Sequence, residues 1–214
     1  MLMKKDQIST AGDQHMIQEI RMLALGDSYT IGECVPAAES WPLLFAKTMH
    51  AKGQNFAQPI VLAKTGWTTG ELIEAIRREN LQKKFNLVSL CIGVNNQYRG
   101  MDPAVFSKEF EKLLLMAIDF AGGEKQYVFV LSIPDWGVSE FGILKGKANV
   151  SQEIDAYNKL AKAICLYHKV DFINITDLSR KAKTASNLLA EDGLHYSAKM
   201  HQQWVDEVIK QRKY

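Results

Sequence analysis

The sequence predicts a single α/β domain built on a five-stranded parallel sheet. Short apolar runs rich in β-forming residues alternate along the chain with longer segments of helical periodicity, which is typical of a parallel sheet covered by helices. The chain has 214 residues and is 47% hydrophobic, so it can bury one sizeable core. We expect one domain over residues 21–214, preceded over residues 1–20 by a polar, weakly periodic N-terminal extension.

Five runs are the predicted strands, and in chain order they read RMLAL, PIVLA, NLVSLCIG, YVFVLSI and VDFINI. The predicted helices have apolar residues spaced three and four apart, and they cover residues 39–51, 69–80, 103–120, 151–168 and 197–212. This alternation favours a doubly wound fold, in which ligands bind beyond the carboxyl ends of the strands. Residues 135–149 follow the fourth predicted strand as a long glycine-containing loop, of the kind often used as a lid or a binding loop.

Composition excludes several classes of function. The 26 basic and 24 acidic residues are interspersed, so we expect no nucleic-acid partner. The longest apolar runs, such as LLLMAI, fall far short of the roughly 20 residues that span a bilayer, and the N-terminus lacks the apolar core of a signal peptide. We therefore expect neither a membrane-spanning nor a secreted protein. No residue pattern indicates an oligomeric state.

Three cysteines, Cys34, Cys91 and Cys165, are widely separated and form no CxxC pair. This pattern indicates reduced thiols in the cytoplasm, and neither a disulfide framework nor a zinc site. Cys91 lies inside a predicted strand, so we interpret it as a small buried hydrophobic residue. Cys34 is close to Ser28 in sequence and is either a loop-packing residue or a reactive thiol.

The first predicted strand ends in LALGDSYTIG, which places Ser28 just beyond a buried run. On this segment alone, a serine that caps a short helix is the simplest interpretation. A phosphate-binding loop is a weaker one, because the segment lacks both GxGxxG and the P-loop lysine. The nucleophile-elbow pattern GxSxG also fails, since Thr30 stands where the second glycine belongs.

Near the other end of the chain, EDGLHYS places Asp192 and His195 three positions apart, just before the last predicted helix. In a helical turn these side chains become neighbours, so the carboxylate could fix the tautomer of the imidazole. If the other ring nitrogen faces Ser28, the three residues form a Ser–His–Asp triad. Taken alone, this spacing favours a capping aspartate beside a histidine whose ring has its hydrogen bonds satisfied.

Two further loops carry candidate hydrogen-bond donors for a developing oxyanion. Gly66, in AKTGWTTGEL, follows the second predicted strand, where a glycine can present its backbone N–H at close range. Asn95, in CIGVNNQ, follows the third predicted strand, and its amide is a donor that stays neutral at any pH. Each has a simple interpretation as a turn residue, but four such residues at one rim of the sheet favour a catalytic site.

Together, the blocks LGDSYTIGE, AKTGWTTGEL, IGVNNQYRG and EDGLHYS make the sequence resemble the SGNH hydrolases, also called the GDSL esterase and lipase family. The resemblance covers nearly all of the chain from about Met22 onward. It implies a flavodoxin-like three-layer α/β/α sandwich. It also implies Ser28 as nucleophile, His195 as base, Asp192 as its partner, and an oxyanion hole formed by the Ser28 backbone N–H, Gly66 and Asn95. The chain departs from the family pattern at Asn96, where the family often has Asp, and at Tyr196, where it often has Pro.

The resemblance implies a serine esterase or lipase that hydrolyses carboxylic esters through an acyl-serine intermediate, without metal or organic cofactor. The substrate would be a small-molecule ester, and the family's activities include short esters, lysophospholipids, thioesters and acetylated sugars. Alternatives are a non-catalytic flavodoxin-like binding module and a phosphate or nucleotide binder. Five residues either line an acyl pocket or have an ordinary packing role in the protein: Trp67, Tyr98, Trp136, Phe141 and Ile143. The remaining histidines are interpreted as surface or helix-end residues: His15, His50, His168 and His201.

Overall fold

The computed structural model describes residues 19–79, 81 and 84–212. Its centre is one sheet of five parallel strands, as the sequence predicts, and these strands lie in the order β2-β1-β3-β4-β5. The strands are β1 (Met22–Gly26), β2 (Ile60–Ala63), β3 (Leu87–Cys91), β4 (Val128–Leu131) and β5 (Asp171–Ile173). In this order β1 has β2 on one side and β3 on the other, so the connection from β1 to β2 and the connection from β2 to β3 run in opposite directions across the sheet.

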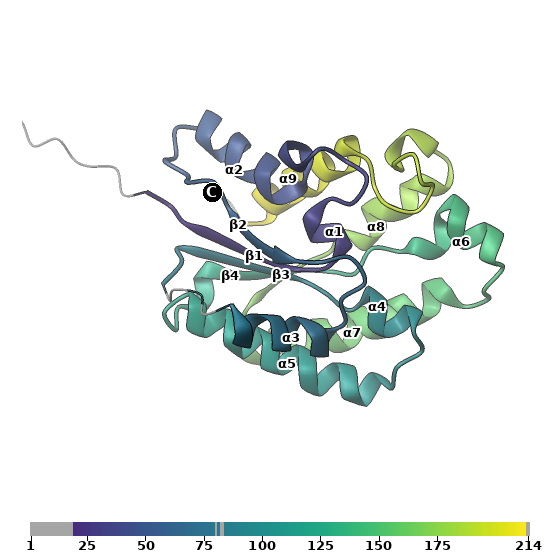
Figure 1. The fold of residues 1–214 in the computed structure, drawn as a ribbon, viewed down its shortest axis with the longest axis horizontal. Helices are drawn as coiled ribbons and strands as arrows, with labels where there is room; N and C mark the ends of the chain where they lie inside the picture. Colours follow the sequence, from purple (N-terminus) through teal and green to yellow (C-terminus); the bar gives the residue numbers. More distant parts are fainter. Residues whose placement is uncertain (1–18, 80, 82–83, 213–214) are drawn as a thin grey trace, which may run out of the picture.

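Helices cover both faces of the sheet and complete three layers (Figure 1). On one face lie α2 (Trp41–Ala51) and α9 (Ala198–Arg212), which contact each other, and on the other lie α3 (Thr69–Arg78), α5 (Pro103–Phe120) and α7 (Val150–His168). All five predicted helices are therefore confirmed. Because both faces are covered, β1, β3 and β4 are buried along their whole lengths, which explains their continuous apolar runs.

Local signals in the sequence explain where the longer helices begin. Thr68 and Glu71 form a reciprocal capping box at the start of α3. Asp102 accepts a hydrogen bond from the Ala104 N–H, and Pro103 occupies the first turn of α5. These caps satisfy backbone donors that a helix leaves unpaired at its start.

The prediction of a loop over residues 135–149 is wrong in part. The segment forms a 3₁₀ turn, η3 (Trp136–Val138), and a helix, α6 (Glu140–Lys145). Ser139 caps α6 by accepting a hydrogen bond from the Gly142 N–H at 3.0 Å. The helix has only six residues and contains a glycine, so its hydrophobic periodicity is too short to detect.

Other short elements also lie below the length at which periodicity is informative. They are the helices α1 (Ser28–Ile31), α4 (Val94–Tyr98) and α8 (Thr176–Ser179), and the 3₁₀ turns η1 (Ala37–Glu39), η2 (Lys125–Tyr127), η4 (Arg180–Lys183) and η5 (Ser186–Leu188). Of the predicted extension, residues 1–18 lie outside the described part of the chain. Ile20 pairs with Phe56 in an isolated parallel bridge beside β1 and β2. No helix within the described ranges is long and apolar enough to cross a membrane.

Candidate active site

The predicted site residues gather at the carboxyl edge of the sheet. Ser28 follows β1, Gly66 follows β2, and Asn95 follows β3 within α4. Because β1 lies between β2 and β3, these three positions surround the point where the chain reverses its direction across the sheet. Open α/β sheets form their ligand crevice at such a point.

Ser28 is the first residue of α1, but it does not cap that helix. The cap is Asp27, whose Oδ1 accepts the Tyr29 N–H at 3.1 Å. The strand must end in glycine here, because a Cβ at Gly26 would lie 2.0 Å from Thr30 Oγ1 and 2.5 Å from the carbonyl oxygen of Cys91. The tight strand-to-helix turn therefore leaves the Ser28 hydroxyl free of the capping role, at the edge of the cavity described below.

Asp27 is a buried carboxyl group immediately before the candidate nucleophile. Burial raises the pKa of Asp27 to about 7, against the opposing effect of hydrogen bonds from the backbone N–H groups of Tyr29, Asp27 itself and Gly93. The raised pKa keeps this group largely neutral in mildly acidic solution.

Asp192 and His195 contact each other directly, as their spacing predicts. Asp192 Oδ2 lies 2.5 Å from His195 Nδ1, while Oδ1 accepts the backbone N–H groups of Leu194 at 3.0 Å and His195 at 2.9 Å. The two residues lie in an irregular turn before α9, held by these backbone bonds and not by a helix. Burial raises the pKa of Asp192, but the hydrogen bonds from Leu194 and His195 outweigh it and hold the pKa below its ordinary value.

The imidazole of His195 is held from a second side by Tyr29. The two rings meet edge to face, with centroids 5.8 Å apart. Since Nδ1 faces the carboxylate of Asp192, Nε2 is the ring nitrogen left for a reaction. Tyr29 belongs to the same short helix as Ser28, so one element positions both the candidate base and the candidate nucleophile.

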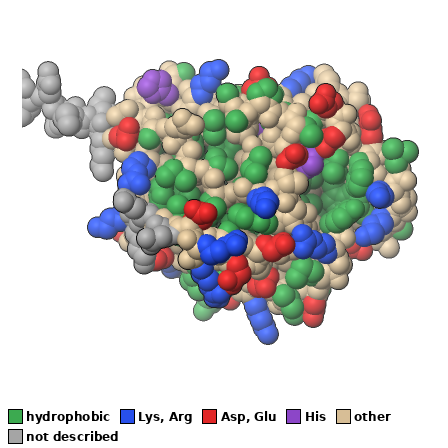
Figure 2. Space-filling view, viewed as in Figure 1, with side chains coloured by type: hydrophobic (Ala, Val, Ile, Leu, Met, Phe, Trp, Pro, Cys, Tyr) green, Lys and Arg blue, Asp and Glu red, His purple; other side chains and the backbone are tan. Residues whose placement is uncertain are grey.

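Four of the five predicted site residues line one cavity of about 210 Å³, and Asp192 lies behind His195 and does not line it. The lining residues are Ser28, Tyr29, Thr65, Gly66, Val94, Asn95, Tyr98, Trp136, Phe141, Leu194 and His195. On the face seen in Figure 2, hydrophobic side chains gather at the end of the molecule that carries α6. The site therefore combines a polar reaction centre with an apolar wall.

Gly66 and Asn95 are held in place by hydrogen bonds between the loop after β2 and the segment after β3. Gly66 has a left-handed backbone, with φ of +83°, and its carbonyl oxygen accepts a hydrogen bond from Arg99 Nη2 at 2.6 Å. Asn95 donates one N–H of its amide to the carbonyl oxygen of Trp67 at 2.9 Å. An amide nitrogen carries two N–H groups, so the second remains for the cavity that Asn95 lines.

Aromatic rings form the apolar wall of the cavity. Trp136 contacts two other rings: its centroid lies 5.3 Å from that of Tyr98 and 6.1 Å from that of Phe141. The other two pocket candidates, Trp67 and Ile143, are not among the lining residues, and Ile143 is 60% exposed. Ile143 lies on α6, and the sequence interpretation of the segment as a loop gave no means of orienting it.

The two departures from the family pattern have structural roles. Asn96 is buried and binds Thr69 twice, accepting its backbone N–H at 3.0 Å and donating to its Oγ1 at 2.7 Å. It thereby joins α4 to the start of α3. Tyr196 is also buried, and its hydroxyl donates to the carbonyl oxygen of Asp135 at 3.0 Å, which fixes the residue after His195.

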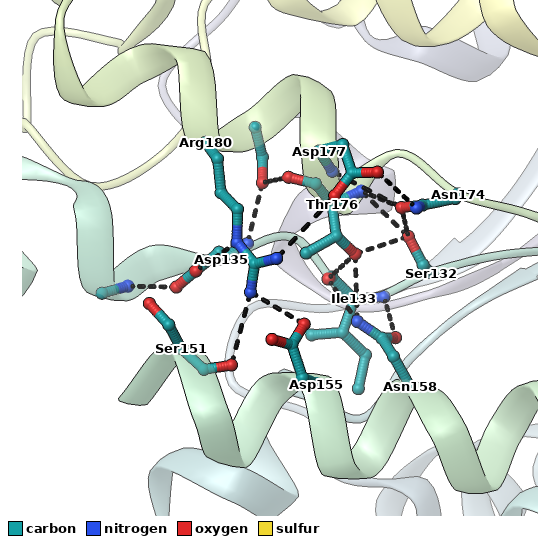
Figure 3. Close-up of polar contacts among 12 residues, drawn as sticks. Ser132, Ile133, Asp135, Ser151, Asp155, Asn158, Asn174, Thr176, Asp177 and Arg180 are labelled. Atoms are coloured by element: carbon teal, nitrogen blue, oxygen red, sulfur yellow. Dashed lines mark hydrogen bonds and ion pairs between the residues drawn. The ribbon is translucent and has the colours of Figure 1, made fainter. Parts of the chain in front are cut away.

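A polar network that the sequence does not reveal holds the loop after β4 (Figure 3). The guanidinium of Arg180 donates from Nε to Asp135 at 2.8 Å and from Nη2 to Asp155 at 2.8 Å. The Asp135 side chain is fully buried, so this ion pair neutralises a charge that has no access to water. The partners are 45 positions apart, and no spacing signal connects them. Through Asp135 the network supports both Trp136 and Tyr196.

One histidine does not match its predicted surface location. His201 is buried in α9, with Nδ1 3.1 Å from the carbonyl oxygen of Glu39, and burial lowers its pKa to about 4. His50 is exposed near the end of α2, and His168 ends α7 paired with Glu111 at 2.7 Å. His15 lies outside the described residues. Packing against α2 and η1 buries His201, which periodicity within α9 alone does not show.

Comparison with known proteins identifies a family and its fold. Residues 24–203 match the GDSL-like Lipase/Acylhydrolase family. A curated arylesterase from Vibrio mimicus is 25% identical over 191 residues, which cover 89% of this chain and 86% of that protein. The lipase/acylhydrolase of Enterococcus faecalis superposes with a TM-score of 0.72 at 21% identity, covering 91% of this chain and 95% of that one. The acetylxylan esterase Axe2 of Geobacillus stearothermophilus superposes with a TM-score of 0.70 at 15% identity, covering 91% and 94%.

Proposed function

Because the chain belongs to the GDSL-like lipase/acylhydrolase family, we propose that it is a serine esterase with Ser28 as nucleophile, His195 as general base and Asp192 as the partner of the base. The observation that carries this assignment is the 2.5 Å contact between Asp192 and His195 Nδ1, beside a cavity that His195 shares with Ser28. A binding site for a neutral ligand has no need of a base whose tautomer is fixed by a carboxylate.

In the first step, His195 Nε2 takes the proton of the Ser28 hydroxyl as Oγ attacks the ester carbonyl. Asp192 holds the imidazole with Nδ1 protonated and stabilises the positive charge that forms on the ring. The imidazolium then gives its proton to the leaving alkoxide as the ester bond breaks. In the second step, His195 takes a proton from water as the water oxygen attacks the acyl-serine carbonyl. The bond between Ser28 and the acyl group breaks, Ser28 regains a proton from His195, and the acid is released.

The oxyanion hole consists of the backbone N–H groups of Ser28 and Gly66 and the free N–H of the Asn95 amide. All three residues line the cavity, and the Arg99 contact to Gly66 and the Trp67 contact to Asn95 hold two of them in position before substrate arrives. Donors that are already oriented stabilise the tetrahedral intermediate without reorganisation during the reaction.

The cavity favours a short acyl group or a small aromatic one. Its volume of about 210 Å³ is below the roughly 300–1,000 Å³ of clefts that hold drug-sized ligands, and the rings of Tyr98, Trp136 and Phe141 bound it. The related arylesterase and acetylxylan esterase are named for aryl esters and for acetylated xylan, respectively. Sugar acetates and thioesters are alternative substrates for the same mechanism.

Several broader properties belong to the same proposal. The substrate is a small molecule, and on the face seen in Figure 2 basic side chains are interspersed with acidic ones, without the continuous basic surface that nucleic acids require. A cytoplasmic location fits the three free cysteines, Cys34, Cys91 and Cys165. A single catalytic domain from about residue 21 onward accounts for the described fold.

Hydrolysis of p-nitrophenyl esters from acetate to palmitate tests this function, with wild type and Ser28→Ala measured in parallel. Ser186→Ala is the matched control, because Ser186 is exposed in η5, away from the lining of the cavity. We expect turnover by wild type and the control, highest for short esters, and none above background by Ser28→Ala. Equal turnover by Ser28→Ala would show that Ser28 is not the nucleophile.

A second pair of variants tests the acyl wall. Phe141→Ala should widen the cavity and raise the rate on longer esters relative to acetate, whereas Leu144→Ala, which removes an 87% exposed side chain from the same helix, should not. An unchanged chain-length profile for Phe141→Ala would mean that this ring does not limit the acyl group.

A further inference from the structure

Cys34 brings a thiol to the outer side of the Asp192–His195 pair. Potential metal-ligating atoms of Cys34, Asp192 and His195 all lie within 4.8 Å of one another, and this is the one such group of three among the residues that the structure describes. Cys34 is exposed on the loop between α1 and η1, and its φ of +65° is unusual for a residue with a Cβ. The mechanism of ester hydrolysis uses no thiol, so this residue has no role in the proposed function.

The surroundings of Cys34 favour a cation and disfavour a free thiolate. Desolvation of the thiol, its hydrogen bond to Asp192 and the nearby carboxylates of Glu33 and Glu191 raise the pKa of Cys34 to about 11. A thiol in this state stays protonated at neutral pH and is a poor nucleophile and a poor target for oxidants. The same negative surroundings attract a divalent cation, which can displace the thiol proton.

We propose that Cys34, Asp192 and His195 form an inhibitory binding site for Zn²⁺. This inference rests on the proposed function, because the inhibited group is the candidate base. A thiolate, an imidazole nitrogen and a carboxylate oxygen are the three ligand types that zinc prefers, and water completes a tetrahedral set. Zinc bonds of about 2.0–2.3 Å bring ligand atoms to within roughly 4 Å of one another, so side-chain shifts of about 1 Å suffice.

Zinc binding would inhibit the enzyme because it moves the proton of the His195 ring from Nδ1 to Nε2. Nδ1, the ring nitrogen beside Asp192, carries the proton in the active tautomer and must lose it to bind zinc. The neutral imidazole then carries its proton on Nε2, where it can no longer accept the proton of Ser28. The imidazole keeps one proton in total, and the carboxylate is already ionised. The only net release is therefore the thiol proton, one for each ion bound.

Metal binding is measured first without any ester, using wild type and Cys34→Ser. Serine keeps a polar side chain of similar shape but is a poor zinc ligand. We expect wild type to bind Co²⁺ with the visible absorbance of thiolate coordination. Titration calorimetry with Zn²⁺ in buffers of different ionisation enthalpy should show one proton released. Cys34→Ser should bind Zn²⁺ at least about 10-fold more weakly, because losing a ligand costs at least as much as losing an outer-shell partner.

Inhibition is then measured as the Zn²⁺ dependence of p-nitrophenyl acetate hydrolysis, with each variant compared with its own metal-free rate. Wild type should lose activity as the site fills, with recovery on chelation, and Cys34→Ser should keep its activity at the same Zn²⁺ concentration. Equal binding by both proteins, or no binding by wild type, would overturn the site. Cys34-dependent binding without inhibition would overturn its inhibitory role. Because metal binding is measured without an ester, its result tests the zinc site whether or not Ser28 is the nucleophile.

Discussion

At the scale of single residues, Asn95 has two tasks on one amide group. One N–H fixes the side chain to Trp67, and the other is the proposed oxyanion donor. We predict that Asn95→Ala lowers kcat by on the order of 10²–10³, the typical cost of losing one oxyanion-hole donor. Steady-state kinetics on p-nitrophenyl acetate checks this, alongside the thermal midpoint of the variant. A folded Asn95→Ala enzyme with wild-type kcat would remove Asn95 from the oxyanion hole.

Asp27 gives a prediction about stability against pH. Its pKa is about 7 in the folded protein and 3.8 in an unperturbed carboxyl, so between these values the folded state keeps a proton that the unfolded chain releases. The contribution of Asp27 to the free energy of unfolding therefore falls as pH rises from about 4 to about 7. Asp27→Asn stays neutral and keeps an oxygen that can accept the Tyr29 N–H.

Urea unfolding of wild type and Asp27→Asn at pH 4.5 and pH 8 measures this effect. The variant should gain free energy of unfolding relative to wild type as pH rises. If the free energies of unfolding of the two proteins differ by the same amount at both pH values, Asp27 ionises as easily in the folded state as in the unfolded chain.

At the scale of elements, Arg180 of η4 holds the loop between β4 and α6. The Asp135 carboxylate is fully buried, and Arg180→Met would leave it without a counter-charge. We predict a loss of about 3 kcal/mol in the free energy of unfolding. The matched control is Asp155→Asn, which removes the partner of Arg180 that is 57% exposed and should cost less than about 1 kcal/mol. Equal urea midpoints for the two variants would contradict this ranking.

The length of a helix decides whether its apolar spacing in the sequence predicts it. The helices α5 and α7 are long enough for their apolar spacing to be read directly, and both were predictable almost to the residue. The six residues of α6 were not, because a helix of this length is stabilised by contacts with its neighbours more than by its own pattern. The burial of His201 was missed for a related reason, since it depends on contact with Glu39, 162 positions away.

At the scale of the whole molecule, the strand order explains why four distant blocks of sequence form one site. The order β2-β1-β3 brings the segments after three strands to one edge, and the irregular turn before α9 places His195 at the same cavity. The candidate site residues could be chosen from the sequence because their types fit one chemistry, and four of the five line one cavity. The supporting contacts of Asn96, Tyr196 and Arg180 were not, because each joins positions far apart in sequence.

Ester hydrolysis by this chain requires that the fold activate the hydroxyl of Ser28, and this activation can be measured by covalent labelling. A fluorophosphonate reacts only with an activated serine, so wild type should gain one adduct, located at Ser28 by peptide mass mapping. Ser28→Ala and His195→Ala should gain none, while Ser186→Ala should label like wild type. An adduct at another residue, or a folded wild-type protein that does not react, would show that Ser28 is not the activated nucleophile.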